Sequence, residues 1–184
     1  MEEIVALVDR AGRVVGSAPR SVVRRENLLH AVTGILVRNT ARQIYVHRRS
    51  DDKDWAPGFH DCAAGGMMHY GELPEASAAR ELGEELGVSG TTLRSLGTSL
   101  YEDDTTRCFA HCFEATWDGP ITHTDTEVAW GRWMTLPDLD ALLEQPQWPF
   151  VPDTRRLLAR LVFEGLHDYT ALESLLPPGR SEFG

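Results

Sequence analysis

The stretch RELGEELGV (Arg80–Val88) gives a short predicted helix an excess of acid. At about 100° per residue, its arginine and its three glutamates fall on one arc of about 140°, whereas Leu82 and Leu86 fall on the opposite side. Ala79 joins the two leucines there, and Ala78 lies near the boundary. One arginine cannot neutralise three carboxylates, so the helix needs further positive charge nearby. The charged residues of the arc are Arg80, Glu81, Glu84 and Glu85.

Two interpretations of this acidic face are open at this point. An isolated cluster of this kind is well explained as a solvated helix surface. Alternatively, a divalent cation supplies the missing charge, and Mg²⁺ or Mn²⁺ suits carboxylates that leave room for water and phosphate oxygens. The helix is predicted to run from Pro74, a residue favoured at the first helical position, to Leu86, with Gly87 as its C-cap. The residues before the helix decide between the two interpretations.

These preceding residues complete a longer motif. Gly66 is followed after five residues by Glu72 and after seven more by Arg80. With every fixed position filled, residues 66–88 resemble the complete signature of the Nudix hydrolase superfamily. The resemblance implies an α/β/α sandwich with a mixed central sheet, in which the signature forms a loop, a helix and a loop. It also implies hydrolysis, dependent on Mg²⁺ or Mn²⁺, of a diphosphate linked to another group.

The same resemblance implies roles for single residues. The family's metal ligands are matched by Glu81, Glu84, Glu85 and the carbonyl of Gly65, and the expected catalytic residues are Glu81, Glu84, Arg80 and Glu72. Arg80 resembles the residue that orients the glutamates, and Glu72 the one that supports the loop. The metal acidifies a water for attack at phosphorus, while a glutamate helps to remove its proton. Glu127 precedes a predicted strand, where many members have an extra metal ligand or base; a solvated loop glutamate explains it equally well.

A second resemblance lies outside the signature. The segments LLHAVTGILV (28–37) and RRSDDKDW (48–55) are similar to the isopentenyl-diphosphate isomerase-like branch of the superfamily. That branch includes the YfcD-like hydrolases, with which the chain shares VPD (151–153) before a last helix. Arg49 and Lys53 align with residues that hold the diphosphate in this branch, and we expect them to hold it from the side opposite the glutamate helix. An exposed basic loop is the alternative interpretation of these two residues.

Isomerase activity is not implied by this second resemblance. The catalytic cysteine of the isomerases aligns with Gly65, and two of their metal-binding histidines align with Met67 and Val23. A third metal-binding histidine does match His30. Adding a proton to an alkene requires a positioned acid, and neither glycine nor methionine supplies one. The chain therefore keeps the residues of a hydrolase and lacks those of an isomerase.

The composition of the 184-residue chain limits its classes of partner. The formal net charge of −10 repels nucleic-acid backbones and anionic membranes. Three cysteines, an odd number, argue against a disulfide framework and favour a reducing compartment. The N-terminus lacks the bases of a signal peptide, and no apolar run approaches the roughly 20 residues of a membrane span. We expect a cytoplasmic protein whose partner is a small-molecule diphosphate, without nucleic acid duplex or membrane; a homodimer is left open.

The length and the order of predicted elements indicate a single layered α/β domain covering residues 1–184, and the resemblance implies that it is a Nudix domain. Two apolar runs, 31–37 and 43–49, are predicted to pair as a hairpin. Paired strands are also predicted in 93–119, and another strand follows near 128–136. The expected parts are N-terminal strands and a short helix in 1–29, the signature in 66–88, closing helices in 152–175 and a flexible tail in 177–184.

The sequence thus predicts a Mg²⁺-dependent Nudix hydrolase that cleaves a diphosphate linkage in a nucleoside diphosphate derivative or in another diphosphate. Two alternatives come from other classes of protein. One is a non-catalytic Nudix module that binds a nucleotide or diphosphate, although such modules typically lose signature glutamates that this chain keeps. The other is an isomerase of the isopentenyl-diphosphate type, against which Gly65 and Met67 argue.

Overall fold

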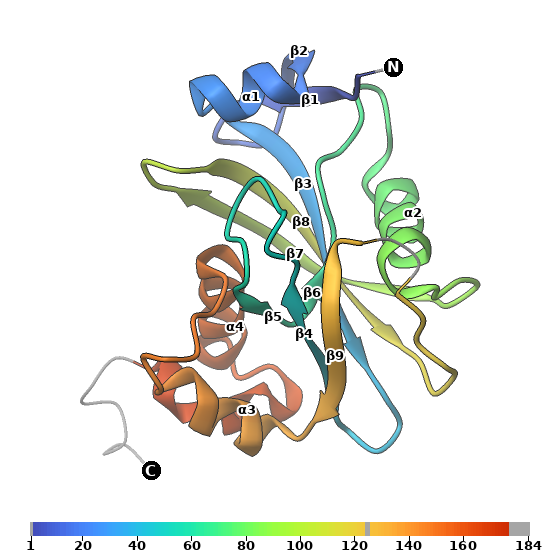
Figure 1. The fold of residues 1–184 in the computed structure, drawn as a ribbon, viewed down its shortest axis with the longest axis vertical. Helices are drawn as coiled ribbons and strands as arrows, with labels where there is room; N and C mark the ends of the chain where they lie inside the picture. The colour runs from blue at the N-terminus through green and yellow to red at the C-terminus, as the bar shows by residue number, and fades with distance from the viewer. Residues whose placement is uncertain (1, 124–125, 177–184) are drawn as a thin grey trace.

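The computed structural model describes residues 2–123 and 126–176 (Figure 1). Within these ranges, nine strands form one curled mixed sheet. The strands are β1 Ile4–Val8, β2 Val14–Pro19, β3 His30–Arg38, β4 Ile44–Arg49, β5 His60–Asp61, β6 Ala63–Ala64, β7 Leu93–Glu102, β8 Arg107–Thr116 and β9 Val128–Met134. The helices are α1 Arg20–Glu26, α2 Pro74–Leu86, α3 Leu136–Leu143 and α4 Pro152–Phe163, followed by the short 3₁₀ helices η1 His167–Ala171 and η2 Glu173–Leu175. The closing helical region is therefore one α-helix and two 3₁₀ turns, and the predicted tail at 177–184 lies outside the described residues.

The middle of the sheet is split, and this corrects the predicted hairpin. β3 and β4 pair only at Arg38 and Ile44, next to their connecting turn. Beyond that point β3 pairs in parallel with β8 along its whole length, while β4 pairs with β9. The short strands β5 and β6 line the gap, since β5 pairs with β4 and β6 with β3. Residues 60–64 therefore lie where the two strands separate.

Helices cover both faces of the sheet. Because side chains alternate along a strand, Ile35 and Val37 of β3 face α2, whereas Leu36 faces α3 and α4. On the α2 side, the core includes Leu82, Leu86, Phe113 and Ala115. On the other side, it includes Ile44, Val46, Leu139, Leu157, Leu158 and Leu161. Figure 1 shows α2 on one side of the sheet and α3 with α4 on the other.

Helix α2 begins and ends where the sequence predicts. Pro74 occupies its first turn, and Gly87 caps its C-terminus in the left-handed conformation, with φ of 65°. The predicted inner face is wrong in one respect, because Ala78 is fully buried whereas Ala79 is exposed. Compared with the predicted inner face, the buried face of the helix is thus rotated towards the glutamates. It includes Glu81 and Glu85, while Glu84 is exposed.

No helix in the described ranges is both long and apolar enough to cross a membrane. Helix α2, which has 13 residues, is amphipathic: one side packs against the sheet and the other faces outward. Its packing fixes where the glutamates lie relative to β3 and to residues 63–66.

Replacing Leu82 by alanine is expected to lower the free energy of unfolding by about 2–5 kcal/mol, because its side chain is 1% exposed and its loss leaves a cavity against the sheet. Leu73→Ala is the control, since Leu73 precedes the same helix but is 71% exposed. Its change should stay within about 0.5 kcal/mol. Urea unfolding of both variants tests the packing of α2, and equal losses would contradict it.

Candidate functional site

Two glycines let the main chain approach the glutamates closely. At Gly65, whose φ is 152°, an added Cβ would lie 2.0 Å from the carbonyl oxygen of Thr33. At Gly66, a Cβ would lie 2.6 Å from Oε1 of Glu81. The Gly65 N–H donates a 3.0 Å hydrogen bond to Glu85. No other residue type fits this backbone at position 65 without displacing β3, so that position presents main-chain groups only.

Arg80 binds three carboxylates at once. Its Nε and Nη2 each donate to one oxygen of Glu72 at 3.0 Å, which is a bidentate contact. Its Nη1 donates to Glu81 at 2.8 Å and to Glu84 at 3.0 Å. The hydrogen bond with Glu72 is the main reason why the pKa of Arg80 rises above its ordinary value. Glu72 also accepts the His69 N–H at 3.0 Å, so the loop before α2 is tied to the arginine.

Positive charge compensates the two buried glutamates only in part, since Arg80 pairs with Glu81 and Lys53 lies near Glu85. Glu85 is 3% exposed, and burial raises its pKa to about 8 although Lys53 opposes the shift. Burial also raises the pKa of Glu81, against the effect of Arg80. Each raised pKa means that the ionised carboxylate is disfavoured where it lies.

Lys53 joins this acid cluster, which corrects the expectation that it stands on the side opposite the glutamates. Its Nζ lies 3.5 Å from Oε1 of Glu85 and forms an ion pair with Glu127. Lys53 is the single lysine in the sequence, and its side chain is 10% exposed. Arg49 is also buried, with Nε and Nη2 donating to the carbonyls of Ala56 and Trp55. The interpretation as an exposed basic loop therefore fails for both residues.

The donors around α2 fit a hard divalent cation. The carboxylates of Glu81, Glu84 and Glu85 and the main-chain carbonyl of Gly65 are all oxygen ligands, which Mg²⁺ prefers. The raised pKa values of Glu81 and Glu85 indicate that a cation is favoured beside them. Among residues 2–123 and 126–176, however, no three His, Cys, Asp or Glu side chains are already grouped around one point. The carboxylates are turned instead towards Arg80 and Lys53.

A cavity of about 310 Å³ begins at these glutamates and runs across the sheet to α4. Its floor consists of small residues on neighbouring strands, among them Gly34, Ala63 and Ala110. Their short side chains leave the space that larger ones would fill. Of the predicted site residues, the cavity is lined by Arg49, Lys53, Gly65, Arg80, Glu81, Glu84 and Glu127. Glu72 and Glu85 lie behind this lining and contact it through Arg80 and Lys53.

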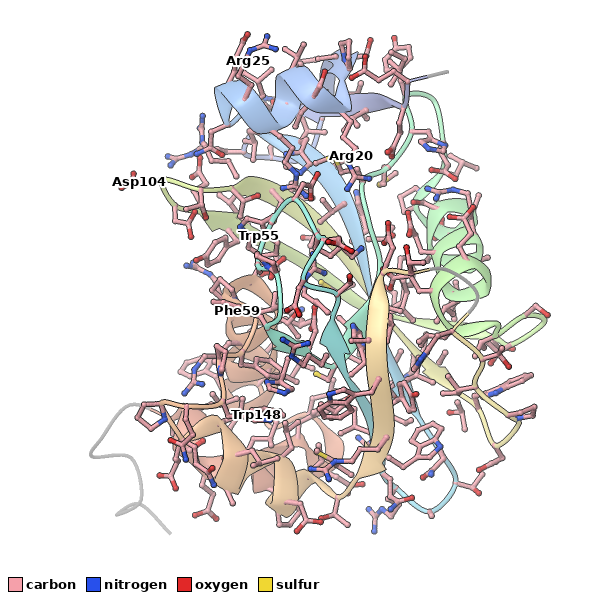
Figure 2. All side chains as sticks on the ribbon, viewed as in Figure 1. Arg20, Arg25, Trp55, Phe59, Asp104 and Trp148 are labelled. Atoms are coloured by element: carbon pink, nitrogen blue, oxygen red, sulfur yellow. The ribbon has the colours of Figure 1, made fainter. Side chains whose placement is uncertain are left out.

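Two arginines are among the lining residues that the sequence did not indicate. Arg20 and Arg24 of α1 both pair with Asp54, at 3.2 and 3.4 Å. Trp55, next in the chain and labelled beside the β7–β8 hairpin in Figure 2, contacts both α1 and that hairpin: Arg24 is 6.0 Å from its ring centroid, and its Nε1 donates to Thr105 at 3.1 Å. These contacts hold the loop after β4 over the cavity. No local pattern signals them, because they join segments far apart in the chain.

Asp61 lies at the end of the cavity away from α2. It is 4% exposed, and its Oδ1 accepts the N–H groups of Cys62 at 2.7 Å and Ala63 at 3.0 Å. Burial, followed by the nearby Asp153 carboxylate, raises the pKa of Asp61 to about 6, although Arg49 opposes the shift. No sequence motif singles out this residue, which lies in the gap between β3 and β4.

Asp61 should make the protein less stable as the pH rises from about 4 to about 6. The folded pKa exceeds the ordinary value of 3.8, so the folded state holds this proton more tightly, and the advantage is lost as pH rises through the folded pKa. Asp61→Asn removes the titration and keeps an oxygen for both N–H groups. Relative to wild type, the variant should gain up to about 3 kcal/mol between pH 4 and pH 7.5. Urea unfolding of both proteins at both pH values measures this gain. The prediction is contradicted if the difference in unfolding free energy between variant and wild type is the same at pH 4 and at pH 7.5.

Comparison with known proteins places this arrangement in a family. The family model described as the NUDIX domain matches residues 28–159. The uncharacterized Nudix hydrolase orf19 of Rhodococcus erythropolis is 45% identical over 168 residues, covering 86% of this chain and 91% of that protein. The uncharacterized Nudix hydrolase YfcD of Escherichia coli K12 is 32% identical over 157 residues, covering 85% of each.

Among solved structures, the crystal structure of DR0079 from Deinococcus radiodurans superposes with a TM-score of 0.72 at 26% identity. The match covers 84% of this chain and 97% of that one. The α/β fold expected from the signature is thereby confirmed, as is the similarity to the YfcD-like branch. With the motif of residues 66–88 folded as a loop, helix and loop beside a cavity, the chain belongs to the Nudix hydrolase family.

Proposed function

We propose that this chain is a Mg²⁺-dependent hydrolase, also served by Mn²⁺, that cleaves a diphosphate linkage in a nucleoside diphosphate derivative or another small diphosphate. The observation that carries the proposal is the pair of buried glutamates on α2, Glu81 and Glu85, beside a cavity and short of positive charge. A solvated acidic face, the alternative considered from sequence, would leave both side chains exposed.

The residues of the signature would have separate roles in metal binding and in positioning the glutamates. Glu81, Glu84, Glu85 and the Gly65 carbonyl would hold the cation. When bound, a divalent metal polarises the diphosphate and acidifies water. Arg80 keeps Glu81 and Glu84 at fixed positions through its contacts at 2.8 and 3.0 Å, and Glu72 holds Arg80. Glu127 is a further carboxylate at the cavity, available as an additional ligand or as the base that accepts a proton from the attacking water.

Lys53 and Arg49 are proposed to hold the diphosphate. Lys53 lies at the glutamate end of the cavity, and its ammonium can pair with a phosphate oxygen there. Arg49 lines the cavity further along and also supports the loop through Trp55 and Ala56. The isomerase alternative gains no support, because position 65 has no room for a side chain that could act as the acid.

Glu84→Gln and Glu85→Gln are each expected to reduce turnover at least about 10²-fold, because each removes a charge from the proposed metal ligands. The measurement is Mg²⁺-dependent phosphate release over a panel of nucleoside diphosphates and triphosphates, sugar nucleotides, dinucleotides, coenzyme A and isoprenoid diphosphates. Glu75→Gln is the matched control, since Glu75 is an exposed acid in the first turn of the same helix. Near-wild-type activity of either variant at limiting Mg²⁺ would refute the metal assignment, provided thermal unfolding shows intact folds.

Lys53→Ala and Arg49→Ala should lower kcat/KM for the diphosphate found by that panel by on the order of 10- to 100-fold, corresponding to about 1.5–3 kcal/mol for a hydrogen bond to a charged group. Arg48→Ala is the control: Arg48 is adjacent in β4 but pairs with Asp51 at the surface, at 2.6 Å. If Lys53→Ala and Arg49→Ala both behave like Arg48→Ala, these residues do not bind the diphosphate.

A further inference from the structure

The N-terminal strand β1 is bonded to the loop that leads into α2. The N–H of Ala6 donates to the carbonyl of Met68 at 3.0 Å, and the N–H of Tyr70 donates to the carbonyl of Ile4 at 2.9 Å. His69 lies between these two bonded loop residues and forms a β-bridge with the same strand. The main chain of His69 is therefore placed by a strand that is not part of the signature.

Glu3 joins the imidazole of His69 to α1. Oε1 of Glu3 lies 3.4 Å from Nε2 of His69. Oε2 of Glu3 accepts a hydrogen bond from Nη1 of Arg20 at 3.1 Å, and the main-chain carbonyl of Glu3 accepts the Arg20 N–H at 3.0 Å. Arg20, which is labelled in Figure 2, also pairs with Asp54 at 3.2 Å. The Glu3 carboxylate is thus held by the arginine at one oxygen and contacts the imidazole with the other.

His69 fixes Glu72 through both its main chain and its side chain. The Glu72 N–H donates to the His69 carbonyl at 3.0 Å, and the His69 N–H donates to Oε2 of Glu72 at 3.0 Å. Nδ1 of His69 lies 3.9 Å from the same Oε2. Glu72 in turn binds Arg80 through both of its oxygens, and Arg80 binds Glu81 and Glu84. The position of His69 therefore bears on two of the proposed metal ligands.

Resting on the proposed function for the identity of the metal ligands, we propose that Glu3 and His69 are positioning residues of the hydrolase site. Their contact joins the signature loop to β1 and α1, and it thereby keeps Glu72 where it can hold Arg80. β1 precedes residues 28–159, which the family model matches, so the site is supported by a segment outside that match. Residues that orient metal ligands influence metal affinity, so loss of the contact should weaken metal binding.

Binding of Mn²⁺ without substrate tests this role independently of hydrolysis. Electron paramagnetic resonance measures free Mn²⁺ during titration of the wild-type protein, Glu3→Ala and His69→Ala. Each variant should bind Mn²⁺ about 3- to 10-fold more weakly, a smaller loss than the roughly 10- to 100-fold typical of residues bonded directly to metal ligands. His69→Ala removes no carboxylate, so weaker binding in that variant cannot come from lost attraction for the cation. The double variant should lose less than the product of the two single effects, because both residues form one contact.

Each variant has a matched control. Glu2→Ala removes the neighbouring acid, which is exposed and binds the Ser21 N–H of α1 at 3.1 Å. It therefore controls for a general loosening of the N-terminus from α1. Tyr70→Ala removes the side chain next to His69 in the same loop, and that side chain is 57% exposed. Both controls should bind Mn²⁺ as the wild-type protein does, and thermal unfolding checks the fold of every variant.

Two further measurements separate positioning from substrate binding. With the diphosphate found by the panel, His69→Ala should lower kcat about 3- to 10-fold and leave KM within about 2-fold, because Lys53 and Arg49 are unchanged. Without metal or substrate, NMR follows the Nε–H of Arg80, which donates to Glu72 at 3.0 Å. This proton should exchange with water at least about 10-fold faster in Glu3→Ala and His69→Ala than in the wild-type protein.

Mn²⁺ affinities of Glu3→Ala and His69→Ala equal to those of their controls overturn the positioning role, as does a double variant whose loss equals the product of the single effects. The proposed function fails separately. If no diphosphate is hydrolysed but both variants weaken Mn²⁺ binding, the hydrolase proposal is rejected and the positioning role stands. If diphosphates are hydrolysed and both variants match their controls, only the positioning role is rejected. If the wild-type protein binds no Mn²⁺, the metal assignment fails and the exchange rate of Arg80 decides the positioning role.

Discussion

The close passage of the main chain at Gly65 and Gly66, between β3 and α2, is the constraint on which the site depends. A Cβ at position 65 would collide with the Thr33 carbonyl, and one at position 66 would collide with the Glu81 carboxylate. Only because neither residue has a side chain can the Gly65 N–H reach Glu85 and the Thr33 N–H reach the Gly66 carbonyl. These two contacts join the signature loop to the central strand and to the helix that carries the glutamates.

The same closeness creates an electrostatic imbalance that the protein corrects only in part. Glu81 and Glu85 are held in the buried half of α2, where ionised carboxylates are disfavoured. Arg80 and Lys53 are the cations beside them, and Arg80 is shared with Glu72 and Glu84. A site with surplus buried acid is suited to a divalent cation in a way that a solvated acidic helix is not. Stability and the proposed chemistry therefore favour opposite arrangements of charge, a pattern typical of functional sites.

The separation of β3 from β4 extends this site into a cavity. Because β3 pairs with β8 and β4 with β9, residues 60–64 enter the gap and bring Asp61 to its far end. Small residues on the sheet keep the path open, and α4 supplies Asp153 opposite. The cavity thus has carboxylates at both ends for different physical reasons. One set comes from a single helix, and the other is assembled from a strand and a helix far apart in the chain.

The sequence by itself determined the local features. Spacings of a few residues decide where α2 begins and ends, its Gly87 cap, and the match of residues 66–88 to the family signature. The structure and the family comparison agree with these predictions. It did not determine which part of the acidic arc faces inward, that β3 and β4 diverge, or that Lys53 meets Glu85. Nor did it indicate that Asp61 and Asp153 share a cavity. The reason is that helical propensity and caps act between near neighbours, whereas burial, strand pairing and pKa shifts depend on contacts between distant segments that only the packed fold brings together.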